Sequence, residues 1–303
     1  MTLNDLRYVV AVADHRHFGR AASACFVSQP TLSTQVRKLE DYLGVRLFER
    51  TNRSVEITPR GAAIIEHARR VLDEVAQIRA LAEGNREPLV GPLRVGIIPT
   101  LCPYLLPWVL PPLHAAYPRL EPVVTEDLTA SLIERLHAHR LDAAILALPV
   151  ADDDLCAVGL FDEPFMVACP PDHPLARAEA IGMKDLRRES ILYVAEGHCL
   201  RDQTLAICGT RGGGTDGDDF SGAGLETIRR LVAAGMGFTL MPVLAVRHDG
   251  APQAGDVVCR PFAGYASRRI GLVHRRSYPR EEDMRLLAET IAANIPPEVT
   301  PVD

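Results

Sequence analysis

The sequence lacks a long apolar segment and a secretory signal, and each absence excludes a class of protein. No apolar run approaches the roughly 20 residues that cross a bilayer as a helix. The longest candidate, Leu141–Val150, is interrupted by Asp142 and Pro149. The first six residues show no basic stretch followed by an apolar core. We therefore expect no membrane segment, and we expect the protein to be cytoplasmic.

Cysteine is scarce, and no metal-binding spacing is present. The 303 residues contain seven cysteines, an odd and scattered set. A secreted disulfide scaffold is shorter and denser in cysteine. Neither Cys-x-x-Cys nor His-x-x-x-His occurs, so we expect no zinc site, no other metal and no cofactor. In a reducing compartment most of these thiols should be buried and inert. The set is Cys25, Cys102, Cys156, Cys169, Cys199, Cys208 and Cys259.

The charge is unevenly distributed along a chain of ordinary globular composition. Hydrophobic residues make up 47% and charged residues 24%, and the length suits two or three domains. The net charge is −6. Residues 1–60 carry nine basic and six acidic side chains, a net charge of +3, so the remainder carries −9. A basic head on an anionic body is compatible with nucleic acid binding at the head.

The N-terminal segment predicts three short helices in succession. Apolar side chains recur at helical spacing within residues 6–13 and again within 18–25. Ser28 is placed to cap a third helix, and Pro30 is tolerated in its first turn because the missing N–H has no partner there. Gly44 is the expected end of that helix.

The third helix presents short polar side chains at its N-terminal end, as a reader of the DNA major groove requires. Arginines can hold phosphates while small polar groups reach base edges. Two extended segments follow and predict a β-wing with arginines at its tip. An ordinary three-helix domain with a solvated polar face stays open as the alternative. The residues expected at DNA are Gln29, Pro30, Thr31, Ser33, Thr34, Arg37, Arg50 and Arg53.

A heptad pattern follows the wing. Thr58 can cap a long helix that begins at Pro59 and ends near Gly84. A single helix of this kind would leave its apolar seam in water, so we expect a second copy of the chain to cover it and form a dimer. Packing of the seam against the chain's own head is the alternative. The seam consists of Ile64, Ala68, Val71, Val75, Ile78 and Ala82.

The remainder alternates β-branched runs with helical patterns, which predicts an α/β sheet covered on both faces. Two threonines, Thr100 after the first strand and Thr129 at the start of a helix, are candidates for a ligand site or for simple N-caps. The expected strands are 93–98, 122–126, 143–148, 165–169, 191–194, 238–241 and 270–274, and the expected helices are 132–138, 225–234 and 284–295.

The head resembles a known family. The residues Phe18–Ala22, Gln29–Ser33 and Leu39–Arg50 resemble the winged helix-turn-helix of LysR-type transcriptional regulators, and Thr58–Gly61 resembles the start of their linker helix. The resemblance implies an α/β protein in which a winged helix-turn-helix and a linker helix precede a two-lobed effector domain similar to periplasmic binding proteins.

The same resemblance implies three parts and two chain crossings between the lobes. The expected parts are a DNA-binding domain at 1–58, a linker and dimerisation helix with a hinge at 59–91, and a regulatory domain at 92–303, with lobe one at 92–163 and 267–295 and lobe two at 164–266.

Two thiols, Cys199 and Cys208, lie nine positions apart. Peroxide attacks a thiolate, which the cationic neighbours His198 and Arg201 would favour, and a second thiol can trap the resulting sulfenic acid. If the intervening residues are helical, the two Cα atoms lie roughly 13 Å apart on opposite faces. A disulfide needs roughly 4.4–6.8 Å, so bridging would require unwinding. The alternative is two ordinary buried cysteines.

The segment Gly197–Gln203, followed by Cys208, resembles the redox segment of the peroxide-sensing branch of the same family. The segments Leu225–Thr227, Ala233–Gly235 and Arg268–Val273 resemble that branch as well. The resemblance implies that Cys199 is peroxidatic and Cys208 resolving. It also implies a peroxide pocket formed by Thr100, Thr129, His198, Asp202 and Arg268, or Arg269 in place of the last.

One stretch departs from this pattern. Residues 209–219 are unusually rich in glycine, which suggests a mobile loop after Cys208. No Gly-Lys-Ser/Thr follows, so a phosphate cradle is not supported.

We therefore expect a regulator that binds promoter DNA, senses hydrogen peroxide through a reversible Cys199–Cys208 disulfide and controls oxidative-stress genes. Expected partners are double-stranded DNA, peroxide, further copies of the chain up to a tetramer, and RNA polymerase. One alternative is a LysR-type regulator with an anionic or aromatic effector in its inter-lobe cleft and incidental cysteines. A thiol peroxidase is the other, although it would leave the DNA-binding head unexplained.

Overall fold

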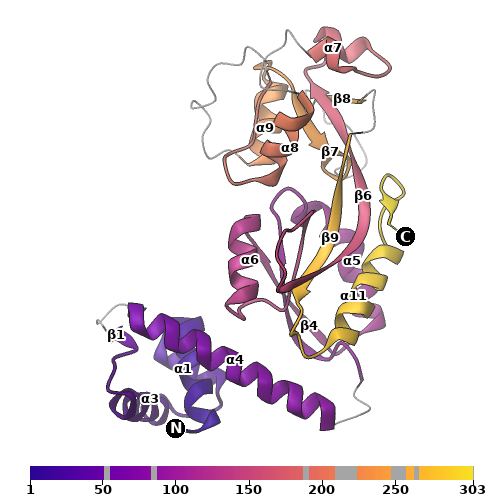
Figure 1. Ribbon diagram of the computed structural model, residues 1–303. Coiled ribbons are helices and arrows are strands. Elements are labelled where there is room, and N and C mark those ends of the chain that lie inside the picture. The colour runs from indigo at the N-terminus through magenta and orange to yellow at the C-terminus, as the bar shows by residue number, and fades with distance from the viewer. Residues whose placement is uncertain are drawn as a thin grey trace. The chain divides into compact units, whose positions relative to one another are not determined.

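The computed structural model describes residues 1–50, 55–82, 87–186, 191–208, 224–246, 257–262 and 266–302 (Figure 1). The chain divides into two compact units. The first unit is Met1–Arg86 with Tyr278–Arg280, and the second is Glu87–Ser277 with Glu281–Asp303. No helix among the described residues is long and apolar enough to cross a membrane.

The first unit begins with the three predicted helices, α1 (Leu3–His15), α2 (Phe18–Ala24) and α3 (Gln29–Leu43). The predicted caps of α3 are confirmed. The Ser28 hydroxyl accepts a hydrogen bond from the Thr31 N–H at 3.3 Å, and Gly44 ends the helix with a left-handed φ of 66°. Val9, Ala21 and Leu32, one from each helix, are fully buried in a shared core.

A two-stranded antiparallel wing follows, made of β1 (Phe48–Arg50) and β2 (Val55–Ile57). The carboxylate of Glu40, on α3, is 2% exposed and fixes the start of this wing. Its Oε1 accepts hydrogen bonds from the N–H groups of Leu47 at 2.8 Å and Phe48 at 3.2 Å. The wing tip, residues 51–54, lies outside the described residues, and Arg53 lies outside with it.

The linker helix α4 spans Pro59–Ala82. As predicted, the Thr58 hydroxyl caps it by accepting from the Gly61 N–H at 2.9 Å. Different parts of the apolar seam fit the two interpretations made from the sequence, packing against the head and contact with a second chain. Ile64 packs against the core of the head and Ala68 is 3% exposed, whereas Val71 and Ile78 are 44% and 66% exposed. Val71 and Ile78 are therefore a part of the seam that is still uncovered. The predicted hinge falls partly on residues 83–86, outside the described residues.

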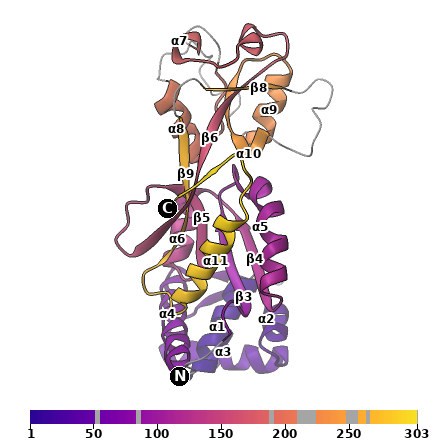
Figure 2. The same ribbon diagram turned by 90° about the vertical axis from the view of Figure 1, so that its right-hand side faces the viewer.

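The second unit has two lobes joined by a long strand. Lobe one is built on a mixed sheet in the order β10-β6-β9-β5-β3-β4, in which β3 runs parallel to β4 and β5, and β9 runs antiparallel to β5 and β6. Helix α6 covers one face of this sheet, and helices α5 and α11 cover the other (Figures 1 and 2). The elements are β3 (Gly91–Ile97), α5 (Cys102–Ala116), β4 (Leu120–Glu126), α6 (Thr129–His137), β5 (Ala143–Leu148), β6 (Leu155–Cys169), β9 (Ser267–Arg275), α11 (Glu281–Ala293) and β10 (Thr300–Pro301).

Strand β6 passes from one lobe to the other (Figure 1). Residues 155–164 pair with β9, whereas residues 165–169 pair with two short strands of lobe two. The elements of lobe two are the 3₁₀ helix η1 (Pro174–Arg177), α7 (Met183–Leu186), α8 (Cys199–Cys208), α9 (Leu225–Ala233), β7 (Thr239–Pro242), α10 (Val243–Val246) and β8 (Val258–Pro261).

Two expectations for the second unit fail. The predicted strand at 191–194 is wrong, because only Ile191 forms a bridge, with Phe238, and the residues after it are irregular. Helix α5 was not predicted, because Pro107, Pro111 and Pro112 lie inside it and proline normally interrupts a helix. Its buried face, which includes Leu105 at 1% exposed, packs in lobe one, and this packing outweighs the poor helix propensity.

The turn between α2 and α3 supports a prediction about stability. Phe26 is 96% exposed and has a left-handed φ of 56°. A left-handed residue with a Cβ costs about 1–2 kcal/mol, and the exposed ring recovers none of this by burial. We expect Phe26→Gly to raise the free energy of unfolding by about 1 kcal/mol in a urea titration. Phe26→Ala is the matched control, because it removes the ring but keeps the Cβ, and it should change little. An equal gain in both variants would contradict the strain argument.

Candidate functional site

The polar side chains predicted to contact DNA lie together on the exposed side of α3. Gln29, Pro30, Thr31, Thr34 and Arg37 are exposed and Ser33 is half-buried, whereas the residues on the opposite side of the helix pack in the core of the head. The N-terminal turn of α3 therefore presents polar side chains at the surface of the head, where the hydroxyls of Ser28 and Thr31 lie 2.8 Å apart. Arg50 ends β1, but its side chain lies outside the described residues.

The two cysteines lie at opposite ends of one helix. Cys199 is the first residue of α8 and Cys208 the last. Both thiols are free and half-buried. Nine helical steps of about 1.5 Å separate their Cα atoms by roughly 13 Å, far beyond the reach of a disulfide. A bond between them therefore requires α8 to unwind. The glycine-rich residues 209–219 that follow lie outside the described residues.

Cys208 lies among apolar side chains and is unreactive in this arrangement. It packs at the edge of a core of lobe two that contains Phe238 and Leu240. Burial raises the pKa of its thiol to about 11. At neutral pH the Cys208 thiol is therefore protonated, and it becomes a better nucleophile only when its surroundings change.

The charges around Cys199 differ from those expected. Burial lowers the pKa of His198, only partly opposed by the nearby Glu126 carboxylate, so His198 favours the neutral form and is not the predicted cation. Arg201 donates to the Val194 carbonyl at 3.3 Å, with its guanidinium 5.6 Å from the ring centroid of Tyr193. The N-terminus of α8 itself supplies the positive field near the Cys199 sulfur.

A buried polar cluster lies beside the crossing strands. Arg268 on β9 is 2% exposed, and its Nη1 donates to the Thr100 Oγ1 at 2.8 Å while its Nη2 donates to the Thr100 carbonyl at 3.0 Å. Arg269 instead faces solvent and pairs with Asp162 at 2.9 Å. The structure therefore distinguishes the two arginines, and Arg268 is the one directed inward.

Neither candidate threonine is an N-cap, so the cap interpretation is wrong for both. The N-cap positions of α5 and α6 are Leu101 and Leu128, which have no capping hydroxyl. The Thr100 hydroxyl accepts from Arg268 instead. The Thr129 Oγ1 is buried without a hydrogen-bond partner among the described residues, and the same is true of the Gln203 Oε1 on α8.

The start of α8 in lobe two lies against the start of α6 in lobe one. Gly197 has a φ of 86°, a conformation that favours glycine, and a Cβ there would lie 2.9 Å from the end of the Leu128 side chain. The Glu126 carboxylate, just before α6, interacts with His198 and accepts a hydrogen bond from the Cys102 thiol. The segments that contain Thr100 and Thr129, which follow strands β3 and β4, therefore lie close to the start of α8.

The remaining predicted residue, Asp202, is exposed on the first turn of α8. A carboxylate there stabilises the positive end of the helix, and the structure does not bring it to the buried cluster. Sequence reasoning missed Gln203 and Glu163, the buried partner of Arg268. The only sequence signal for Glu163 is an acidic residue within an apolar strand.

Three of the other thiols are held in the protonated form. Burial and the Glu126 carboxylate raise the pKa of Cys102 to about 12. Burial also raises the pKa of Cys25 and of Cys169, with small opposing effects of nearby arginines. These three cysteines are therefore poor candidates for reaction with peroxide.

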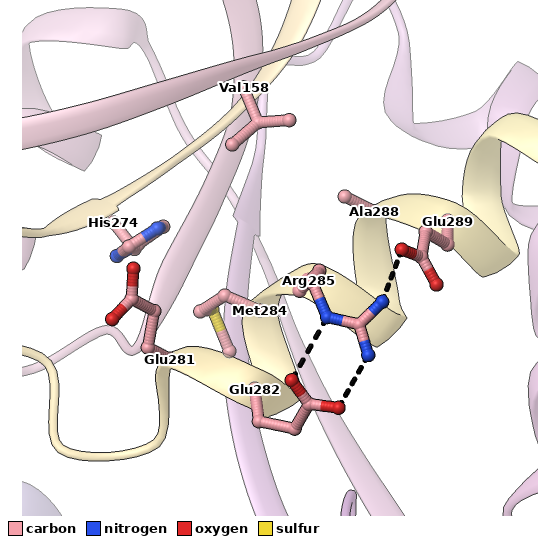
Figure 3. Close-up of a pocket in the computed structure, with 8 residues that line it drawn as sticks. All are labelled: Val158, His274, Glu281, Glu282, Met284, Arg285, Ala288 and Glu289. Atoms are coloured by element: carbon pink, nitrogen blue, oxygen red, sulfur yellow. Dashed lines mark hydrogen bonds and ion pairs between the residues drawn. The ribbon is translucent and has the colours of Figure 1, made fainter.

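A surface pocket of about 560 Å³ lies elsewhere on lobe one, between β6, β9 and α11 (Figure 3). Arg285 is bound by Glu282 and Glu289 on the same helix, while Glu281 points toward His274. The lining contains no cysteine and carries more acidic than basic groups. It is therefore unsuited to an anionic effector and takes no part in the thiol site.

The fold and these sites define a DNA-binding transcriptional regulator with a separate two-lobed regulatory domain. Residues 3–62 match the family model of the bacterial regulatory helix-turn-helix protein, lysR family, and residues 86–296 match the LysR substrate binding domain. The chain belongs to the LysR family.

Individual relatives are also similar over nearly the whole chain. The "Hydrogen peroxide-inducible genes activator" of Pectobacterium carotovorum subsp. carotovorum is 45% identical over 96% of both chains. The structure of full-length OxyR from Pseudomonas aeruginosa with a cysteine-to-aspartate substitution is 42% identical over 96% of this chain and 94% of that one, with a TM-score of 0.83. A hydrogen peroxide-bound cysteine-to-serine mutant of OxyR from Corynebacterium glutamicum is 35% identical over 97% and 92%, with a TM-score of 0.65.

The raised pKa of Cys208 predicts its reactivity. With a pKa of about 11, about 0.1% of the thiol is ionised at pH 8, against about a quarter for a free cysteine. We expect iodoacetamide to label Cys208 in the folded, reduced protein on the order of 100-fold more slowly than a free cysteine. Labelling followed by peptide mass spectrometry measures this rate. In guanidinium the rate should rise to that of a free cysteine, and equal rates in folded and unfolded protein would contradict the assignment.

Proposed function

We propose that this protein is a peroxide-responsive transcriptional regulator whose switch is a reversible Cys199–Cys208 disulfide. The observation that carries the proposal is the position of these thiols at the two ends of a single helix. Because the helix and the disulfide exclude one another, one covalent bond selects between two structures of lobe two. The names of the peroxide-inducible activator and of the OxyR structures support this function.

The proposed chemistry consumes one peroxide and two thiols. The Cys199 thiolate attacks one peroxide oxygen, an S–O bond forms, and the O–O bond breaks. The hydroxide that leaves takes up a proton and becomes water. The Cys208 sulfur then attacks the sulfenic sulfur, releasing a second water and closing the disulfide. The two thiols lose two electrons and the peroxide gains them. The orphaned Thr129 hydroxyl, with Thr100, His198 and Arg268, supplies polar groups for the peroxide.

At the other end of the chain, we propose that α3 enters the major groove of promoter DNA. Gln29, Thr31, Ser33 and Thr34 reach base edges, Pro30 shapes the first turn, and Arg37 with the wing arginines Arg50 and Arg53 holds phosphates. The protein acts in the cytoplasm, where it meets DNA and RNA polymerase. Oxidation alters the packing of the lobes and hence the spacing of paired DNA-binding heads.

The rival functions are less well supported. A thiol peroxidase would turn over with a reductant, and we propose that this protein is not an enzyme, because the DNA-binding head would then have no role. A regulator with an anionic or aromatic effector would hold that ligand in the inter-lobe cleft, and its cysteines would be incidental. The position of two thiols at the ends of one helix favours the switch over this alternative.

Thiol mapping tests the switch. The reduced protein is treated with about one equivalent of peroxide, alkylated and digested, and free thiols are identified by mass spectrometry. We expect Cys199 and Cys208 to be lost together and the other five cysteines to stay labelled. Cys199→Ser should abolish this response but keep DNA binding by the reduced form. Cys208→Ser, the matched control, should still oxidise at Cys199 and accumulate its sulfenic acid. Unchanged thiols in the wild type would rule out the proposed switch.

The exposed part of the linker helix tests oligomerisation. We propose that α4 forms a dimer through the seam that continues past the head at Val71 and Ile78, and that dimers associate further into tetramers. Val71 is 44% exposed, so a charge there should leave the monomer folded and weaken the dimer. We expect Val71→Glu to shift the mass measured by light scattering toward the monomer. Glu74→Lys, a charge change at an exposed position off the seam, is the control. A monomeric wild type would contradict the proposal.

A further inference from the structure

An ion pair that is completely buried lies where the chain crosses between the lobes. Glu163 on β6 and Arg268 on β9 are direct neighbours across the two strands. Both side chains are 0% exposed, and the guanidinium Nε donates to the Glu163 Oε2 at 2.8 Å. Removing two charges from water is costly, and the loss is recovered only when every polar group finds a well-placed partner. The hydrogen-bond partners of both side chains therefore determine whether burial of this pair is tolerated.

The contacts form a chain that extends from lobe one to lobe two. Arg268 donates to the hydroxyl and to the carbonyl of Thr100, in lobe one. Glu163 uses its other oxygen, Oε1, to accept from the Leu244 N–H at 3.0 Å, in lobe two. One carboxylate therefore fixes the guanidinium on one side and the backbone of α10 on the other.

The direction of these hydrogen bonds determines what Thr100 can offer. A guanidinium has only donors, so the Thr100 Oγ1 must act as the acceptor for Arg268. Its own hydroxyl hydrogen is then directed elsewhere. A short series of contacts links Thr100 to the start of α8. Cys102 lies two residues after Thr100, and its thiol donates a hydrogen bond to the Glu126 carboxylate. The same carboxylate interacts with His198.

We propose that Glu163 is a positioning residue for the reaction of Cys199 with peroxide. Its carboxylate holds Arg268 on Thr100, so that Thr100 presents its hydroxyl as a hydrogen-bond donor. The donor faces the peroxide oxygen that carries negative charge as the O–O bond breaks and leaves as hydroxide. Glu163 touches neither the peroxide nor the thiol. The inference rests on the proposed peroxide function.

Glu163→Gln tests this role because it keeps the shape of the side chain and removes its charge. We expect the second-order rate constant for sulfenic acid formation at Cys199, followed by stopped flow with peroxide, to fall by about 10- to 100-fold, since losing one donor to a developing oxyanion typically costs on the order of 100-fold. The closest control is Asp162→Asn. It removes the neighbouring carboxylate, whose partner Arg269 faces solvent, and should leave the rate unchanged.

A double-mutant cycle separates positioning from mere support of the fold. Thr100→Val removes the hydroxyl through which Glu163 is proposed to act. We expect Glu163→Gln to slow the wild type but to have almost no further effect on the rate in the Thr100→Val background. Its effect on the melting temperature should persist in both backgrounds. Equal slowing in both backgrounds would show that Glu163 supports only the fold and would overturn the inference.

Two further outcomes keep the test decisive. If Glu163→Gln does not fold, Glu163→Asp keeps the charge but shortens the side chain, and the same cycle with Thr100→Val applies. If the wild-type Cys199 reacts with peroxide while Glu163→Gln reacts as fast, the positioning role fails and the proposed function stands. If the wild-type thiol does not react, the proposed function fails and the inference fails with it.

Discussion

The length of one helix is the constraint on which the regulatory half of this protein depends. An α-helix rises about 1.5 Å per residue, so two cysteines at the ends of α8 cannot approach within the reach of a disulfide. The same spacing that keeps the reduced thiols apart makes a disulfide between them incompatible with the helix. Cys208 adds a second barrier, because burial raises its pKa and keeps it protonated until α8 opens. The reduced state is therefore protected by geometry and by protonation together.

The helix is also weak enough to be remodelled. It has ten residues, and an isolated helix of that length is marginal in water. Thr204 bonds back to the Leu200 carbonyl at 2.7 Å, a contact that slightly destabilises helices, and the Gln203 Oε1 is buried without a partner among the described residues. Burial of Leu200 opposes unwinding by roughly 1.5–3 kcal/mol. The formation of one covalent bond therefore competes with only a few side-chain contacts.

Local signals predicted the head more completely than the body. The caps at Ser28, Gly44 and Thr58 and the periodic apolar residues act over a few positions, so the sequence shows them directly. Helix α5 was not predicted from the sequence, because it contains prolines that normally interrupt a helix and is stabilised by packing in lobe one. Likewise, the cysteine spacing showed that a helix over residues 199–208, if formed, would exclude the disulfide. The burial that keeps His198 neutral depends on distant elements, and the role of Glu163 can be inferred only from the strand pairing that places it beside Arg268.

Helix α8, the proposed oxidation sensor, and the buried cluster proposed to position Thr100 meet at α10. Ala245 of α10 lies in the same core as Leu200 of α8, so unwinding α8 removes part of the packing that holds α10. The next residue back along α10, Leu244, donates its backbone N–H to Glu163, whose other oxygen binds Arg268. Movement of α10 therefore perturbs the Glu163–Arg268 ion pair. The effect is strong because both charges are buried, so water cannot replace a hydrogen bond that is lost. In the proposed mechanism, the polar chain that orients Thr100 for the reaction is thus also a route by which the disulfide can alter lobe one.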